Sequence, residues 1–306
     1  MRQLKRIIVG YDLTADGEDV LQSATILARR SGAALKLVHV IEPYSLYQRL
    51  SHPFTEPYSQ EELAQKAGHQ LEACAIGLMS RETQKEALSV EYEVRTGKPF
   101  VELILARRGW DGDLIVVGGT RQGEGILLGS TADRVVRKAM VPVLVAKKRL
   151  AETIRTILVP TDFSSCAKKA AEEALVLAER FGSRVHFFHA LEPLPAYALG
   201  ADPVAAALPP VALVRPEDLE GEWQAFLADL PHLDAVQWTK ETKEGLSLAQ
   251  IAKQVEIHGP DLIVLGTHGR TGIPHMLLGS VAERVVQQIS CPVLTIRPDA
   301  FEFTLP

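Results

Sequence analysis

Short apolar runs alternate along this chain with longer segments in which apolar residues recur at helical spacing. The runs are rich in Val, Ile and Leu and almost continuously apolar, which is typical of strands buried on both faces of a parallel sheet. This alternation predicts a doubly wound α/β sheet with right-handed crossovers. The strands and helices expected in the first half are, in chain order, 7–11, 15–31, 35–41, 60–86, 90–94, 99–109, 113–117, 130–139 and 142–146.

The second half of the chain repeats the first. A shift of 150 residues places RIIVGYDLT (6–14) on TILVPTDFS (156–164) and LLGSTADRVV (127–136) on LLGSVAERVV (277–286). A fixed period of this kind indicates duplication. In the second half, a helix is expected over 164–180. The expected strands there are 156–160, 184–190, 235–240, 261–265 and 292–296.

We therefore predict two fused copies of one domain, a first copy (1–149) and a second copy (150–306). Each is expected to hold a five-stranded parallel sheet flanked by helices, in a Rossmann-like or flavodoxin-like arrangement. The copies differ most between their second and third strands, at 43–59 and 193–216. The second of these segments is rich in proline, which cannot continue a helix or a central strand. We expect it to be a mobile flap or a partner-facing loop.

Composition narrows the classes of function. The net charge of −5 and the scattered Lys and Arg residues leave no basic stripe, so nucleic acid is not expected as a partner. No run approaches the roughly 18 apolar residues of a membrane span, and the first residues do not resemble a signal peptide. We expect a cytoplasmic protein without membrane contact. Cys74, Cys166 and Cys291 are far apart and are expected to be structural apolar residues.

The chemistry-bearing residues of the second copy follow two of its expected strands. Asp162 comes directly after one strand, and Gly266, Gly269, Gly279 and Ser280 come after another. In open α/β sheets, ligands bind at the carboxyl ends of strands. Glycines let backbone N–H groups approach an anion, and a helix beginning at Ser280 would add free donors. This arrangement favours an elongated polyphosphate, with side-chain donors from Ser280, His268 or Arg270.

At these residues the chain resembles the universal stress protein family, whose ATP-binding members carry G-x2-G-x9-G-[ST]. Gly266, Gly269, Gly279 and Ser280 match every position, and the resemblance covers nearly the whole chain twice. It implies two domains of the adenine nucleotide α-hydrolase-like fold, and ATP, ADP or AMP as ligand. It also implies that Asp162 and the Ala190 backbone hold the adenosine end. The residues implied to contact nucleotide are Pro160, Thr161, Asp162, Ala190, Leu265, Gly266, His268, Gly269, Arg270, Gly279, Ser280 and Val281.

The first copy departs from this motif. Gly118 matches Gly266, but Arg121 stands where Gly269 is expected, and the loop before Gly129 is two residues shorter. Gly123 and Gly125 could offset the missing glycine. The residues retained for a weaker nucleotide site are Asp12, Val40, Gly118, Gly129 and Ser130.

Structural interpretations stand beside these functional ones. Ser280 with Glu283 forms a capping-box pattern, and Asp162 could form an Asx turn or cap a helix. His39 and His189 lie within expected strands, where buried, hydrogen-bonded histidines are common. The spacings among His186, His189, His268 and His275 match no metal motif, so we assign no protein metal site. Mg²⁺ bound with the nucleotide would relieve repulsion between Asp162 and phosphate.

Three classes of function remain open: a stress-response nucleotide switch, a nucleotide-free interaction module, and a slow ATPase or nucleotidyl transferase. The sequence has no G-x4-G-K-[ST] loop, no G-x-S-x-G elbow and no evident base, so we name no catalytic residue and prefer the switch. The resemblance further implies pairing through the last strands. Segments 141–146 and 291–296 are thus the expected internal pseudo-dimer contact. A homodimer and an unidentified protein partner stay open.

Overall fold

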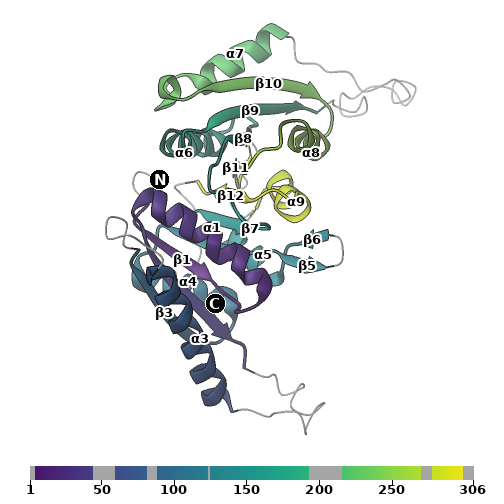
Figure 1. Cartoon of the computed structure of the whole chain (residues 1–306). Coiled ribbons are helices and arrows are strands. Elements are labelled where there is room, and N and C mark those ends of the chain that lie inside the picture. Colours follow the sequence, from purple (N-terminus) through teal and green to yellow (C-terminus); the bar gives the residue numbers. More distant parts are fainter. Residues whose placement is uncertain are drawn as a thin grey trace, which may run out of the picture. The chain divides into compact units, whose positions relative to one another are not determined.

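The computed structural model describes residues 4–43, 59–80, 88–122, 125–192, 216–269 and 278–298. The chain divides into two compact units. The N-terminal unit comprises Met1–Glu152 with Phe301–Pro306, and the C-terminal unit comprises Thr153–Ala300. Each unit holds one layer of parallel strands with helices packed on it (Figure 1).

The N-terminal unit contains a parallel sheet of strand order β3-β2-β1-β4-β7. This order is the 3-2-1-4-5 of a Rossmann-like half, and it differs from the flavodoxin order. The predicted α/β fold is thus confirmed, in its Rossmann-like form. The elements are β1 (Arg6–Gly10), α1 (Ala15–Ser31), β2 (Ala34–Ile41), α3 (Gln60–Ser80), β3 (Val90–Thr96), α4 (Pro99–Trp110), β4 (Leu114–Gly118), β5 (Thr120–Gln122), β6 (Gly125–Leu127), α5 (Ser130–Lys138) and β7 (Val143–Ala146).

The C-terminal unit repeats this sheet with the order β10-β9-β8-β11-β12, again all parallel. Its elements are β8 (Thr156–Pro160), α6 (Ser165–Phe181), β9 (Arg184–Leu191), α7 (Pro216–Leu227), a 3-10 helix (Leu233–Ala235), β10 (Trp238–Glu244), α8 (Ser247–His258), β11 (Leu262–Gly266), α9 (Ser280–Gln288) and β12 (Val293–Ile296).

Capping residues and small side chains explain where the helices begin, end and pack. Ser164 precedes α6, and its side chain accepts a hydrogen bond from the N–H of Ala167, which satisfies one of the free donors of the first turn. Gly182 ends α6 in the left-handed conformation (φ 70°) that glycine adopts without strain. Between these caps, α6 buries a series of alanines against the sheet, so the helix backbone can approach the strands closely.

The third strand of each sheet differs from the prediction of strands buried on both faces. Both β3 and β10 are edge strands, and Tyr92 of β3 is 43% exposed. The expected strand 235–240 begins only at Trp238, because Leu233–Ala235 forms a 3-10 helix. The antiparallel β5–β6 hairpin was not expected from the sequence either. Most of the divergent segments 43–59 and 193–216 lies outside the described residues.

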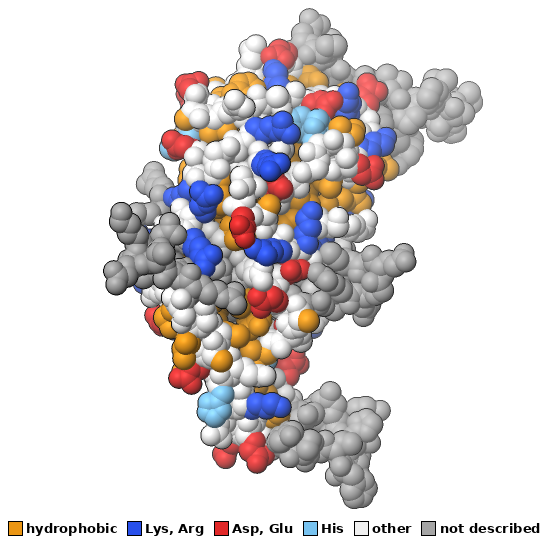
Figure 2. Space-filling model, in the orientation of Figure 1, with side chains coloured by type: hydrophobic (Ala, Val, Ile, Leu, Met, Phe, Trp, Pro, Cys, Tyr) orange, Lys and Arg blue, Asp and Glu red, His pale blue; other side chains and the backbone are white. Residues whose placement is uncertain are grey.

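The state of the cysteines and the distribution of charged side chains agree with the expectations from composition. None of the three cysteines forms a disulfide, and Cys166 and Cys291 are buried. Their thiols donate to the carbonyls of Ile296 and Pro260. Within the described residues, no helix is long and apolar enough to cross a membrane. Figure 2 shows Lys and Arg side chains interspersed with Asp and Glu on the visible face.

A pair of isoleucines of the C-terminal unit tests the position of its core. Ile263 of β11 is 0% exposed, whereas Ile257 of α8 is 71% exposed. Ile263→Ala should lower the free energy of unfolding by about 2–5 kcal/mol because it leaves a cavity. Ile257→Ala should change it by no more than about 0.5 kcal/mol. Urea unfolding followed by the fluorescence of Trp223 and Trp238 measures both. Equal losses would contradict the assigned sheet core.

Candidate functional site

The C-terminal unit has a cleft at the carboxyl ends of β8 and β11, which are neighbours in the sheet. From β8 the chain continues to β9 and β10, and it then returns past β8 to β11. Because crossovers are right-handed, these opposite directions place α6 and α8 on opposite faces of the sheet, as Figure 1 shows. The cleft, of about 220 Å³, lies at this reversal of strand order.

The structure brings eleven of the twelve residues predicted in the second copy to this one cleft. The twelfth, Arg270, lies outside the described residues. The lining residues that were predicted are Pro160, Thr161, Asp162, Ala190, Leu265, Gly266, His268, Gly269, Gly279, Ser280 and Val281. The lining residues that sequence reasoning missed are Ala167, Phe188, Ser247, Ile251, Thr267 and Ala282.

The N-terminus of α9 supplies backbone donors to the cleft. Gly279 is the N-cap, and Ser280 is the first helical residue, exposed and without a capping hydrogen bond from its side chain. The capping-box interpretation of Ser280 is therefore wrong. The first intrahelical bond runs from the N–H of Glu283 to the carbonyl of Gly279 (2.9 Å). The N–H groups that precede it have no partner within the helix and favour an anion there.

Asp162 and Gly269 meet across the cleft. Oδ1 of Asp162 accepts from the N–H of Ser164 (3.1 Å), so the Asx-turn interpretation holds. Ser164, and not Asp162, caps α6. A Cβ atom on Gly269 would stand 2.8 Å from Oδ2 of Asp162. Glycine at this position therefore keeps the loop backbone beside the carboxylate.

One side of the cleft is apolar. Phe188 of β9, Ile251 of α8 and Leu265 of β11 line it, and all three side chains are buried. Pro160 of β8, which pairs in register with Phe188, extends the same surface. A flat apolar ring suits such a surface, whereas a bare phosphate does not.

His189 and His268 have structural partners beside the cleft. Nδ1 of His189 lies 2.8 Å from the carbonyl of Thr161, and its ring lies 4.4 Å from the Phe163 ring. His39 makes the equivalent contact with the Tyr11 carbonyl (2.9 Å). The hydrogen bonds predicted for these strand histidines are confirmed, but both residues are half-buried and not buried as expected. Nδ1 of His268 lies 2.9 Å from Oγ1 of Thr267.

The N-terminal unit has a matching cleft of about 330 Å³, lined by all five residues predicted there. Two features distinguish it. Tyr11 occupies the place of Thr161 and is 7% exposed, and burial is the largest cause that raises the pKa of its phenol well above the usual range. After β4, the chain forms the β5–β6 hairpin, in which Arg121 pairs with Ile126. A strand residue thus stands where the second copy has Gly269.

Two of the missed residues come from an element that the motif does not contain. Ser247 and Ile251 lie in the first turns of α8, which follows the edge strand. Pro99 and Leu103 of α4 line the other cleft in the same way. The internal repeat was the signal that could have pointed to them, because both helices begin just after their third strand.

Gly266 tests how closely the cleft is packed. A Cβ atom there would stand 2.9 Å from the backbone carbon and oxygen of Cys166. Gly266→Ala should therefore lower the free energy of unfolding by about 1–3 kcal/mol. Gly221→Ala is the control, because a Cβ in α7 meets nothing within 4 Å. It should raise stability by about 0.4–1 kcal/mol. Urea unfolding compares the two, and a neutral Gly266→Ala would contradict the close contact between β11 and α6.

Comparisons with known proteins agree with this architecture. The sequence profile of the Universal stress protein family matches residues 3–147 and again 153–297. A universal stress protein of Mycolicibacterium smegmatis is 26% identical over 95% of this chain and 97% of its own length. One from Methanocaldococcus jannaschii is 33% identical over 47% of this chain and 82% of its own length.

Solved structures show the same fold. A universal stress protein from Archaeoglobus fulgidus superposes with a TM-score of 0.71 at 18% identity, covering 96% of this chain and 99% of that one. One from Pseudomonas aeruginosa gives 0.66 at 18% identity, covering 97% and 94%. With two matches of the family profile that together span most of its length, this chain belongs to the universal stress protein family, as a tandem member.

Proposed function

We propose that the C-terminal unit binds ATP or a related adenine nucleotide, ADP or AMP. The observation that carries this proposal is one cleft with two chemical halves. Free N–H groups of α9 and a glycine turn form one half, and an apolar surface forms the other. Phosphates need the first half and adenine needs the second.

The phosphate half of the cleft has room for a phosphate chain because its glycines carry no side chains. Added Cβ atoms would stand 2.8 Å from Asp162 Oδ2 at Gly269 and 3.2 Å from the Thr267 carbonyl at Gly279. Both glycines thus leave backbone exposed where a phosphate chain would lie. We place the phosphates at Gly269, Gly279 and the first N–H groups of α9, with the Ser280 hydroxyl as a further donor.

The nucleoside half places adenine against Phe188, Ile251 and Leu265, with the Ala190 backbone at its edge. Asp162 would accept hydrogen bonds from ribose hydroxyls, a role that suits a carboxylate at the end away from the phosphates. Where phosphate approaches this carboxylate, Mg²⁺ would supply the opposing charge.

We propose a different role for the N-terminal unit. Its β5–β6 hairpin commits the backbone after β4 to strand pairing, so those amides are not available to phosphate in the same way. The unit would then act as a structural or regulatory partner of the nucleotide site. The same observation favours a second candidate function, in which the family fold serves as a nucleotide-free interaction module.

Bound nucleotide would act as a signal by favouring one conformation or one partner, which requires different affinities in the two states. We name no catalytic residue, so turnover, if present, would be slow. Cytoplasmic location, pairing through the last strands and the partner's identity stay proposals.

A charge placed at the first residue of α9 tests the site. Ser280→Asp should reduce ATP affinity at least about tenfold, or 1.4 kcal/mol, because the new carboxylate repels phosphate. It should not lower the melting temperature, because Asp is favourable in a first helical turn. Calorimetric titration with ATP and Mg²⁺ measures the affinity.

Ser130→Asp is the matched control, because Ser130 holds the same first position in α5, also after a glycine N-cap. It should leave ATP affinity unchanged. Equal affinity in wild type and Ser280→Asp would overturn the placement of phosphate at α9. A loss confined to Ser130→Asp would assign the nucleotide to the N-terminal unit instead.

A further inference from the structure

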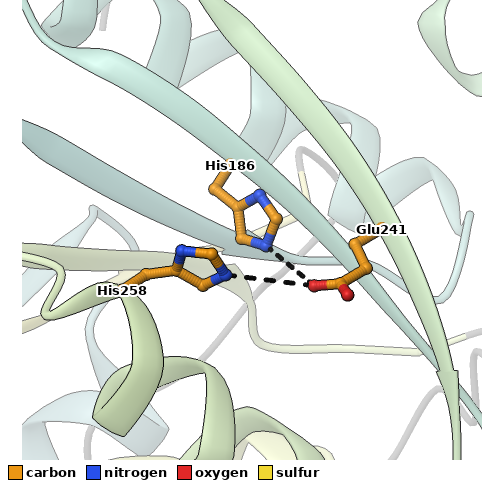
Figure 3. A group of neighbouring side chains, drawn as sticks. All are labelled: His186, Glu241 and His258. Atoms are coloured by element: carbon orange, nitrogen blue, oxygen red, sulfur yellow. Dashed lines mark ion pairs between the residues drawn. The ribbon is translucent and has the colours of Figure 1, made fainter.

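Three side chains from separate elements of the C-terminal unit converge outside the set of residues that lines the cleft. His186 lies on β9, Glu241 on the neighbouring β10, and His258 is the last residue of α8. Both imidazoles face the same carboxylate oxygen, as Figure 3 shows. Oε2 of Glu241 lies 3.6 Å from Nε2 of His186 and 4.0 Å from Nε2 of His258.

The spacing is that of ligands slightly open around a metal ion. The three ligand atoms lie within 4.8 Å of one another. Tetrahedral Zn²⁺ with bonds of about 2.0–2.2 Å needs ligand atoms roughly 3.3 Å apart. Small rotations about side-chain bonds close this difference, and His258 and Glu241 are 36% and 29% exposed, so both have room to rotate. Two imidazoles and one carboxylate form a ligand set typical of Zn²⁺.

Neighbouring polar groups orient two of the three proposed ligands, His186 and Glu241. Nδ1 of His186 lies 2.8 Å from Oγ1 of Thr239, and a proton donated along that contact leaves Nε2 as the metal-binding nitrogen. Lys243 pairs with the other oxygen of Glu241, Oε1, at 2.9 Å. That contact leaves Oε2 facing the two imidazoles. Partners of this kind fix ligand orientation in known metal sites.

Gln254 and burial complete the surroundings of His186. Oε1 of Gln254, 2% exposed, lies 3.1 Å from Nε2 of His186, so this amide must turn aside when a metal takes the nitrogen. His186 is itself buried, at 7% exposure, so its metal-binding nitrogen lies inside the protein.

In the N-terminal unit, Lys36 occupies the position that corresponds to His186. Lys36 pairs in register with Glu91 on the adjacent strand, as His186 pairs with Thr239. Its ammonium lies 3.1 Å from Glu91 and 4.0 Å from Glu93, which is the counterpart of Glu241.

Trp110, the counterpart of His258 at the end of α4, lies beneath the same ammonium at 5.3 Å. The N-terminal unit thus holds the ammonium group of Lys36 between its strands and the end of α4. The other copy replaces that lysine with histidine and the tryptophan with a second histidine. This exchange substitutes metal ligands for a resident positive charge.

We propose that His186, Glu241 and His258 bind one Zn²⁺ ion, which ties the edge strand β10 to β9 and to the end of α8. The backbone carbonyls at that helix end also favour a cation. Ser247, at the opposite end of α8, lines the nucleotide cleft. His186, Glu241 and His258 are not among the residues that line the cleft, although the His186 ring lies 6.5 Å from the ring of Phe188, which does line it. The zinc site is therefore distinct from the nucleotide site.

Zinc titration of the full chain tests this proposal. The protein is dialysed against a chelator, then titrated with ZnCl₂ in a calorimeter without nucleotide. We expect one equivalent of Zn²⁺ per chain and a higher melting temperature when it is bound. His258→Gln and Glu241→Gln should each weaken binding at least tenfold and remove the thermal shift. Both positions are partly exposed, so the fold should tolerate them.

His232→Gln is the matched control, because His232 contacts Glu179 at 2.7 Å on the surface, and no third ligand joins them among the residues that the structure describes. It should bind Zn²⁺ as the wild type does. Absence of one-equivalent binding to the wild type would overturn the proposal, as would unchanged affinity in both ligand variants. Titration with Co²⁺ distinguishes binding at cysteine, because sulfur ligation adds a thiolate charge-transfer band that this site would lack.

Discussion

The structure depends on the divergence of the chain at the carboxyl ends of two adjacent parallel strands, β8 and β11. Right-handed crossovers send the following helices to opposite faces of the sheet, and the backbone after each strand is left to line the cleft between them. Close contact is needed to hold this arrangement. At Gly266 the end of β11 lies against the backbone of Cys166 at the start of α6. Asp162, Gly269 and the N-terminus of α9 take their positions from that contact.

The two units share one fold but place different residues at equivalent positions. Their sheets share a strand order, and their clefts lie at equivalent strand ends. After β4 the N-terminal unit forms a hairpin, whereas the C-terminal unit places Gly269 beside Asp162. On the second strand, Lys36 of β2 stands where the C-terminal unit has His186 of β9. Function therefore follows from the residues placed on the fold and not from the fold itself.

Much of the fold could be predicted because its strongest signals are local. Buried strands such as β1 and β11 read as continuous apolar runs, and the repeat fixed the number of units. The glycine spacing, together with the family resemblance that it supports, identified eleven of the seventeen residues that line the cleft of the C-terminal unit. Edge strands were harder, because β3 and β10 contain many charged residues and stand at the ends of the sheet order, so neither reads as a continuous apolar run. The start of β10 depended on a 3-10 helix whose turn has no distinctive residue pattern.

Other features could not be predicted because they arise only when distant segments meet. Ile251 reaches the cleft through a helix that follows the edge strand. Glu241 and His258 follow His186 in the sequence by 55 and 72 residues. No short spacing in the sequence therefore reveals this group. Ser280 matched a capping pattern, but Gly279 took the N-cap. That outcome leaves the Ser280 hydroxyl available to a ligand.

The stoichiometry of nucleotide binding tests the central claim most directly. Full-length protein, denatured and refolded or exchanged until no nucleotide is released from it, is titrated calorimetrically with ATP and Mg²⁺. One equivalent of ATP per chain is predicted, because the phosphate-binding loop is intact only in the second copy. No binding, together with no adenine nucleotide released from the purified protein, would contradict the account. Two equivalent sites per chain would contradict the distinction drawn between the two units.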